Sequence, residues 1–171
     1  DRVPPPEQWR LERHNAMKAR LLEGNADLLF IGDSITQGWE ETGKEVWDYY
    51  YADRNAVNLG TSSDRTFHVL WRLDDRDFSK VSPKLAIIMI GTNNRAMHTA
   101  EQIAEGVTAI VQSVRGKLPQ TKVLLLGIFP RETAPDAENR VKLAAANKIL
   151  ASLDDGQNIF FLDIGEEFLN D

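Results

Sequence analysis

The run Leu28-Leu29-Phe30-Ile31, followed directly by Gly32-Asp33-Ser34-Ile35-Thr36, decides the fold. Four consecutive apolar residues that end at a glycine are typical of a short strand buried on both faces. The strand therefore ends in a tight turn that presents Ser34. A serine hydroxyl is a poor nucleophile alone, but beside backbone N–H donors at a strand end it is well placed for acyl transfer. The other interpretation is that Ser34 caps a following helix, which is a common role for serine.

Four more short apolar runs follow this one along the chain. They are Ala56–Leu59, Leu85–Ile90, Val123–Ile128 and Ile159–Leu162. Helical patterns separate the runs, and strands that alternate with helices favour a parallel sheet covered on both faces. With right-handed crossovers, the sequence predicts a three-layer α/β/α sandwich around a five-stranded parallel sheet.

The helical patterns have recognisable ends. The first covers Glu7–Glu23 and stops at Gly24, after a proline-rich lead-in over Asp1–Pro6 that we expect to be extended. A capping box formed by Thr99 and Gln102 opens a later helix, which Pro119 terminates. Two more helices are indicated by residues that share one helical face: Thr66, Val69, Leu70 and Leu73 for one, and Leu143, Ala146, Leu150 and Leu153 for the other.

Two further polar motifs also follow apolar runs. Asn58-Leu59-Gly60-Thr61-Ser62-Ser63-Asp64 closes the second run, and Gly91-Thr92-Asn93-Asn94 closes the third. In an open parallel sheet, ligands bind beyond the carboxyl ends of the strands. We therefore expect these two motifs and Ser34 to meet at one edge of the sheet.

The three motifs, in this order, resemble the SGNH (GDSL-type) hydrolases. Val69-Leu70-Trp71-Arg72-Leu73 and the Gly91–Asn94 motif look most like the branch that includes the platelet-activating-factor acetylhydrolase catalytic subunits. The resemblance implies the strand order 2-1-3-4-5. It also implies that Ser34 is the nucleophile, and that the Ser63 N–H and the Asn93 side-chain amide hold the oxyanion.

Two departures from the family pattern stand out. The family usually has glycine where this chain has Ser63, and a serine there restricts φ without removing the N–H donor. The Asp-x-x-His block that supplies the triad acid and base is absent from residues 1–171, as is the last helix. We interpret the chain as a single SGNH hydrolase domain, with that block expected beyond Asp171. Without the last helix, we also expect apolar sheet surface to be uncovered.

Several other residues near the three motifs are candidates for the substrate pocket. For each of them a structural role is the alternative: Asp33 and Asn94 would support turns, and Asp64 would pin its loop as an N-cap or through neighbouring N–H groups. His98 is a pocket residue or, as a less favoured interpretation, a substitute base, whereas His14 and His68 lie on helices. The candidate pocket residues are Asp33, Gly60, Asp64, Asn94, His98 and Arg131.

Two more features have a structural and a functional interpretation. Asp163 ends the fifth run and could be mistaken for the triad acid, but we expect it to pin its loop. An aromatic-rich stretch follows the nucleophile, and we favour packing on the core over an acyl-binding wall. Its members are Trp39, Trp47, Tyr49, Tyr50 and Tyr51.

Composition excludes several classes of function. The net charge is −6 and the Lys and Arg residues are scattered, which argues against nucleic-acid binding. The chain has no cysteine and its histidines lack metal-ligand spacing, so we expect no disulfide, metal or cofactor.

No apolar run approaches the roughly 20 residues of a membrane span. A start at Asp1 favours a secreted or periplasmic location over a cytoplasmic one but does not decide it. The oligomeric state is open, a homodimer included.

Together these observations predict a serine esterase that hydrolyses short acyl esters, acetyl first, of a carbohydrate or lipid through an acyl-enzyme. The alternative is an inactive SGNH-fold protein that keeps the pocket and binds an acylated carbohydrate. A flavodoxin-like nucleotide-binding domain is disfavoured, because no glycine-rich phosphate-binding motif follows any strand.

Overall fold

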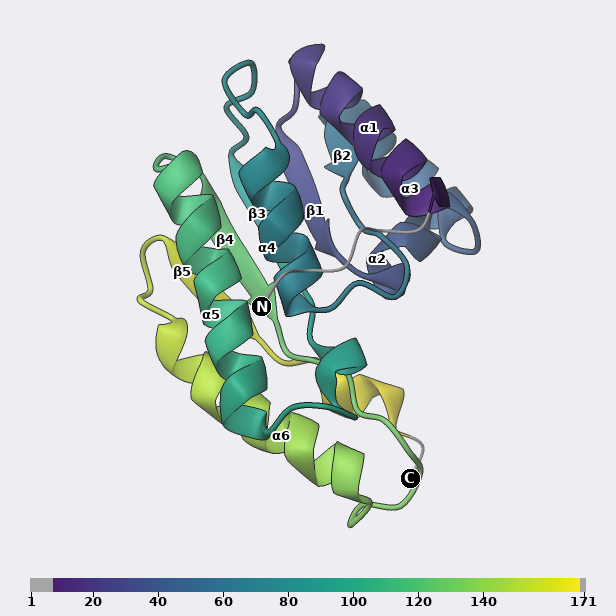
Figure 1. The fold of residues 1–171 in the computed structure, drawn as a ribbon, viewed down its shortest axis with the longest axis vertical. Coiled ribbons are helices and arrows are strands. Elements are labelled where there is room, and N and C mark those ends of the chain that lie inside the picture. Colours follow the sequence, from purple (N-terminus) through teal and green to yellow (C-terminus); the bar gives the residue numbers. More distant parts are fainter. Residues whose placement is uncertain (1–7, 170–171) are drawn as a thin grey trace.

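The computed structural model describes residues 8–169, so the expected extended lead-in over 1–6 lies outside the described residues. Five parallel strands form one sheet in the order β2-β1-β3-β4-β5 (Figure 1). This order confirms the sequence prediction. The strands are β1 (Leu28–Gly32), β2 (Ala56–Asn58), β3 (Leu85–Met89), β4 (Lys122–Leu126) and β5 (Ile159–Leu162).

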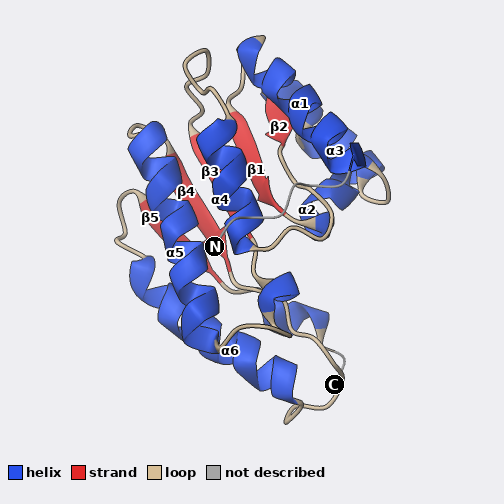
Figure 2. Cartoon of the chain, viewed as in Figure 1, coloured by secondary structure: helices blue, strands red, loops and turns tan. Residues whose placement is uncertain are grey.

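Helices lie on both sides of this sheet (Figure 2). The predicted first helix runs over Gln8–Leu22. Gly24 follows its end and has a φ of +75°, a conformation that suits a glycine. The expected capping box is present at the fifth helix, where Thr99 Oγ1 accepts from the Gln102 N–H at 3.3 Å. The α-helices are α1 (Gln8–Leu22), α2 (Ser34–Gln37), α3 (Lys44–Tyr50), α4 (Thr66–Asp75), α5 (Ala100–Lys117) and α6 (Glu138–Leu150).

The main hydrophobic core lies between one face of the sheet and helices α1, α4, α5 and α6. Strand residues alternate between faces, so Ala86 and Ile88 of β3 belong to this core whereas Ile87 does not. Helix α5 contributes a continuous apolar stripe to it through Ile103, Val107, Ile110, Val111 and Val114, none more than 1% exposed.

The opposite face is covered by α2, α3 and the turn between them. Phe30 of β1 packs edge-on against Trp47 and Tyr51 there, with ring centroids 4.9 and 5.0 Å apart. Tyr49 and Tyr50, by contrast, are 81% and 54% exposed. The packing predicted for the aromatic stretch is therefore right for part of it and wrong for these two tyrosines, which lie on the solvent side of α3.

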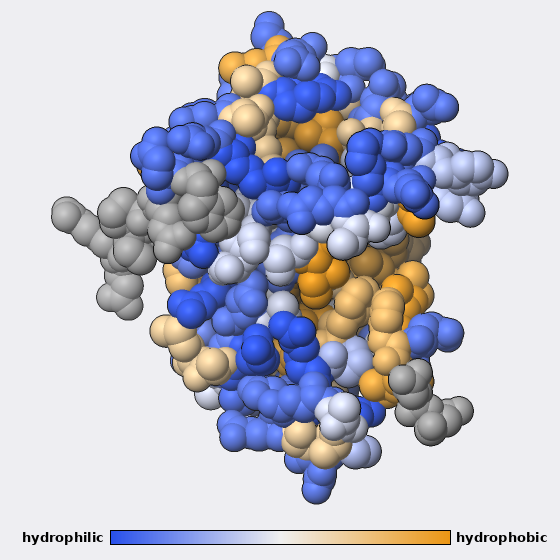
Figure 3. Space-filling model, turned by 90° about the vertical axis from the view of Figure 1, so that its right-hand side faces the viewer, coloured by the Kyte–Doolittle hydropathy of each residue, from blue (hydrophilic) through white to orange (hydrophobic). Residues whose placement is uncertain are grey.

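Beyond α3 the same face carries exposed apolar side chains. Leu162 at the end of β5 is 46% exposed, and Phe168 is 57% exposed. Figure 3 shows apolar side chains gathered in a hollow on one side of the molecule. The structure thus has the uncovered apolar surface that the sequence predicted.

Candidate active site at the carboxyl edge of the sheet

Ser34 lies on the solvent side of the turn that ends β1. It is the first residue of α2, so its N–H has no acceptor within the helix. Asp33 caps the helix, because its Oδ1 accepts from the Ile35 N–H at 3.0 Å. Gly32 is required before them, since a Cβ there would overlap Thr36 Oγ1 and the Met89 carbonyl. The turn therefore exposes the Ser34 hydroxyl at the end of β1.

The carboxyl group of Asp33 is buried although it is next to the exposed serine. Its side chain is 1% exposed, and within residues 8–169 its Oδ2 has no hydrogen-bond partner. Burial raises the pKa of Asp33 to about 6, although the Ile35 N–H and the charge of Arg131 act in the opposite direction. Asp33 is thus a turn-forming residue with one oxygen that lacks a partner.

The second motif forms a tight turn over Thr61–Asp64, in which the Asp64 N–H donates to the Thr61 carbonyl at 3.2 Å. Ser63 is exposed and has a φ of +62°, a conformation that L-residues with a Cβ disfavour. The resemblance to the SGNH hydrolases implies glycine at this position, and the positive φ gives a physical reason for a glycine there. Among the described residues, the Ser63 N–H has no acceptor.

This turn packs through polar contacts against the turn that contains Ser34. Asn58 donates from Nδ2 to the Thr36 carbonyl at 2.8 Å and accepts from the Gly60 N–H at 2.9 Å. The Thr61 N–H donates to the Gly32 carbonyl at 3.1 Å. Gly60 allows the close approach, because a Cβ would lie 2.6 Å from the Gln37 nitrogen. The first two motifs are therefore joined backbone to backbone.

A buried ion pair anchors the end of the same turn. Arg72 of α4 donates from Nε to Asp64 Oδ2 at 2.6 Å and from Nη2 to Oδ1 at 3.2 Å. The two side chains are 2% and 1% exposed. Asp64 does pin its loop, but the prediction that it does so as an N-cap or through neighbouring N–H groups is wrong. Its partner is a guanidinium group eight residues along the chain.

The third motif contacts the second one directly. Asn93 donates from Nδ2 to the Asp64 carbonyl at 2.9 Å, which occupies one of its two amide hydrogens. Asn94 is buried and ties the loop to α4: its Oδ1 accepts from the Thr66 N–H at 3.1 Å, and its Nδ2 donates to Thr66 Oγ1 at 3.0 Å. Asn93 is thus the amide with a remaining donor, whereas Asn94 supports the turn.

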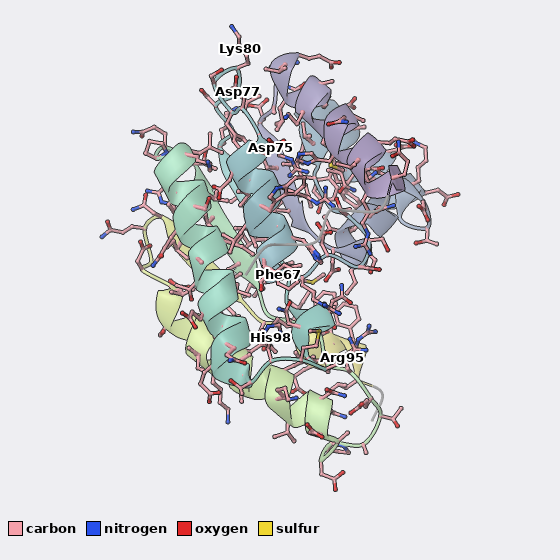
Figure 4. All side chains as sticks on the ribbon, in the orientation of Figure 1. Phe67, Asp75, Asp77, Lys80, Arg95 and His98 are labelled. Atoms are coloured by element: carbon pink, nitrogen blue, oxygen red, sulfur yellow. The ribbon has the colours of Figure 1, made fainter. Side chains whose placement is uncertain are left out.

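In the described part of the chain, the three histidines form hydrogen bonds with residues other than Ser34. His14 bonds Asp75 at 2.9 Å, and Figure 4 shows Asp75 near the edge of the sheet opposite His98. His68 accepts the Arg65 N–H on Nδ1 at 3.0 Å, and burial lowers its pKa. His98 is half-buried beside Asn94, with 3.4 Å between their Nδ atoms. None of the three hydrogen-bonds to Ser34.

The other candidates lie around the same edge. Arg131 is exposed and donates from Nε to Thr92 Oγ1 at 3.1 Å, so it adjoins the third motif. Asp163 accepts from the Gly165 N–H and from Asn147 Nδ2, at 2.9 and 3.1 Å, which is the predicted loop-pinning role. No cluster of three or more potential metal ligands occurs within residues 8–169.

An apolar cavity of about 690 Å³ opens beside Ser34. It extends along the face of the sheet that α2 and α3 only partly cover. Its apolar walls include Phe30, Ile35, Met89, Leu126, Phe129 and Phe168.

A search of the described helices for a membrane span found none with the length and apolar character required.

Sequence reasoning missed the polar side chains that hold the loops together. Gln37, which accepts from the Ser62 N–H at 2.8 Å, lies three residues after Ser34 and hence on the same side of a helical turn. Arg13 of α1 donates from Nε to the Gly60 carbonyl at 2.7 Å and forms two further bonds to Glu40. Only the spacing of Gln37 from Ser34 was a usable signal, since Arg13 is 47 residues from Gly60.

Known proteins are similar to this chain in sequence. The profile of the GDSL-like Lipase/Acylhydrolase family matches residues 30–171. Platelet-activating factor acetylhydrolase IB subunit alpha2 of Rattus norvegicus is 35% identical over 165 residues, which cover 96% of this chain and 70% of the relative.

Solved structures share the fold at low sequence identity. A GDSL-like lipase from Bacteroides thetaiotaomicron superposes with a TM-score of 0.68 at 19% identity, covering 94% of this chain and 80% of that one. A catalytic mutant of an acetylxylan esterase from Geobacillus stearothermophilus gives a TM-score of 0.67 at 18% identity, covering 85% and 78%.

Proposed function

Because the chain belongs to the GDSL-like lipase/acylhydrolase family, whose members hydrolyse ester bonds, we propose that it removes short acyl groups, acetyl first, from a carbohydrate or a lipid. The reaction proceeds through an acyl-enzyme on Ser34. The names of two similar proteins, an acetylhydrolase and an acetylxylan esterase, support acetyl as the acyl group.

One observation carries the proposal: the second loop at the carboxyl edge is hydrogen-bonded to both the first and the third, and within residues 8–169 each loop has a suitable group without a hydrogen-bond partner. Ser34 offers a hydroxyl, Ser63 offers its main-chain N–H, and Asn93 keeps one amide hydrogen beyond the bond to Asp64. Neutral donors in fixed positions are what a developing oxyanion requires.

The mechanism follows from these groups. Ser34 Oγ attacks the ester carbonyl and transfers its proton to a histidine base, which an aspartate orients. The carbonyl oxygen becomes an oxyanion held by the N–H groups of Ser34 and Ser63 and by the Asn93 amide. On collapse the histidine gives its proton to the departing alcohol. The same histidine then takes a proton from water, which attacks the acyl-enzyme, and returns it to Ser34 Oγ as the acid leaves. Within residues 8–169 no histidine hydrogen-bonds to Ser34, so we propose as the base the histidine of the Asp-x-x-His block that the family resemblance implies.

The test is hydrolysis of p-nitrophenyl esters, from acetyl to octanoyl, by a protein that includes the Asp-x-x-His block. We expect the highest kcat/KM with acetyl, and an added mass of one acetyl group on Ser34 in quenched reactions. Ser34→Ala should abolish both signals. Ser113→Ala, on a half-buried serine of α5, is the matched control and should leave both unchanged.

Two results would contradict the proposal. Ester hydrolysis that survives Ser34→Ala would exclude Ser34 as nucleophile. Binding of an acetylated oligosaccharide without any turnover, by a protein that includes an Asp-x-x-His block, would favour the inactive binding protein instead.

A further inference from the structure

Three arginine side chains contact the third motif of the candidate site. Arg131 donates from Nε to Thr92 Oγ1 at 3.1 Å, and Arg95 donates from Nη1 to the Thr92 carbonyl at 2.8 Å. Arg65 donates from Nε to the Asn93 carbonyl at 3.3 Å. Three positive charges are therefore gathered at the loop that carries the proposed oxyanion amide.

These three charges have no acidic partner in the described part of the chain. Within residues 8–169, the ion pairs involve other basic side chains, and no carboxylate lies within 4.0 Å of a nitrogen of Arg65, Arg95 or Arg131. Figure 4 shows Arg95 at the opposite end of the molecule from Asp75 and Asp77. The protein as a whole carries a net charge of −6, so a positive site at this edge runs against the overall charge and attracts anions locally.

Two of the three guanidinium groups keep their terminal nitrogens open. Arg65 and Arg131 are each anchored through Nε alone, and their Nη1 and Nη2 groups have no hydrogen-bond partner among the described residues. Arg95 instead uses Nη1 for the carbonyl of the residue three positions before it, which is a structural contact. A guanidinium group held at Nε still offers two N–H groups end-on, the arrangement that binds a carboxylate or a phosphate.

Both open guanidinium groups are close to the groups that would act on the ester. The positive charge of Arg131 acts on the buried carboxyl of Asp33, the residue before Ser34, and lowers the pKa of Asp33 against the larger effect of burial. Arg65 contacts Asn93, whose side-chain amide is the proposed oxyanion donor. An anion bound by these two arginines would therefore lie beside the reacting ester.

We propose that Arg65 and Arg131 bind an anionic group, a carboxylate or a phosphate, on the alcohol part of the ester, so that the enzyme selects negatively charged acetyl esters. The anion belongs to the alcohol part because an acetyl group carries no charge. Acidic sugars and phosphorylated lipids both present such a group. This inference rests on the proposed function, because it places the anion on the substrate that Ser34 attacks.

The test compares three acetyl esters that differ only in the para group of the alcohol part. They are p-acetoxybenzamide, p-acetoxybenzoate and p-acetoxyphenyl phosphate, and the protein includes the Asp-x-x-His block. The readout is the ratio of kcat/KM for each anionic ester to kcat/KM for the neutral amide. Arg131→Gln should lower this ratio about tenfold, the order of one hydrogen bond to a charged group, and added salt should reduce the loss. The ester with the larger fall identifies the anion as a carboxylate or a phosphate.

Matched variants separate this role from a general effect of charge. Arg54→Gln removes an exposed arginine of η2 (Ala52–Arg54), which precedes β2 at the amino edge of the sheet, and should leave the ratio unchanged. Arg131→Lys keeps the charge but loses the planar fork, so it should recover only part of the ratio. Arg65→Gln should lower the ratio as Arg131→Gln does.

Binding without turnover gives a second readout. Titration calorimetry with p-acetoxybenzoate and p-acetoxyphenyl phosphate should show about tenfold weaker binding to Ser34→Ala/Arg131→Gln than to Ser34→Ala. Equal binding by the two proteins, or equal falls of kcat/KM for all three esters, would overturn the anion site while leaving the esterase proposal intact. Full activity of Ser34→Ala would overturn the esterase proposal itself. If Arg131→Gln fails to fold, Arg65→Gln gives the same comparison.

Discussion

The ion pair between Asp64 and Arg72 yields the sharpest prediction about the stability of the site. Both side chains are almost completely buried, at 1% and 2% exposure, and two hydrogen bonds join them at 2.6 and 3.2 Å. Asp64→Asn keeps the shape of the side chain but removes its charge. The guanidinium group of Arg72 would then be buried without a counter-charge.

Removing one partner of a buried pair costs about 3–5 kcal/mol of unfolding free energy, because the remaining charge loses its compensation. For a domain of this size each kcal/mol lowers Tm by roughly 2–4 °C, so the expected loss is on the order of 6–20 °C. The assay is urea and thermal unfolding followed by circular dichroism. The matched control is Asp48→Asn, which breaks the exposed pair with Lys44 and should cost less than about 1 kcal/mol.

The double variant Asp64→Leu/Arg72→Met tests the explanation itself. If the loss arises from an uncompensated charge, replacing both groups by apolar side chains should recover much of the stability that the single variant loses. A loss below about 1 kcal/mol in Asp64→Asn, or a double variant less stable than Asp64→Asn, would show that the pair is not what holds the turn.

Three more predictions concern the oxyanion donors and the nucleophile turn. Asn93→Ala should lower kcat by about 100- to 1000-fold with little change in KM, because the amide acts on developing charge; a loss confined to KM would make it a binding residue. Ser63→Gly should leave kcat within a few-fold or raise it, since glycine adopts a φ of +62° without penalty; a large loss would mean that the hydroxyl is the functional group. The pKa of Asp33 is raised to about 6, so the folded protein binds a proton that the unfolded chain releases near pH 4, and this contribution to stability should be lost as the pH rises from about 4 to about 6. Asp33→Asn still offers an oxygen to the Ile35 N–H, and urea unfolding at several pH values should show the stability difference between the two proteins changing across that window only; a pH-independent difference would contradict the burial argument.

The fold could be predicted from the sequence because its signals are local. Each strand is a short run of apolar residues, as in Leu85–Met89, and each run is followed by a polar turn or a helix. Such a pattern admits few arrangements once strands are parallel and crossovers right-handed. The convergence of three motifs at one edge follows from the same rule, since every parallel strand ends there.

The polar contacts within the site could not be predicted in the same way. Arg72 and Asp64 are eight residues apart, yet nothing in either side chain shows that both are buried; scattered charges are ordinarily solvent-exposed. Gln37 lies 25 residues from Ser62; its three-residue spacing from Ser34 places it on the same side of the helical turn, but nothing in the sequence indicates that it contacts Ser62. These contacts form only when the folded sheet brings the loops close together, so local sequence patterns do not indicate them.

The same contacts explain how the chain accommodates Ser63. Glycine at that position would adopt a positive φ without assistance, whereas serine needs support from its surroundings. The Gln37 amide oxygen of α2 binds the N–H of the preceding residue, Ser62, and Arg72 binds the side chain of the next residue, Asp64, so the turn is held on both sides of Ser63. Helix α2 therefore presents the Ser34 hydroxyl and also binds the turn that contains Ser63. If Ser34 and Ser63 have the proposed roles, Gln37→Met in α2 should lower the rate of acylation although Ser34 is unchanged, because the two turns are joined by this contact.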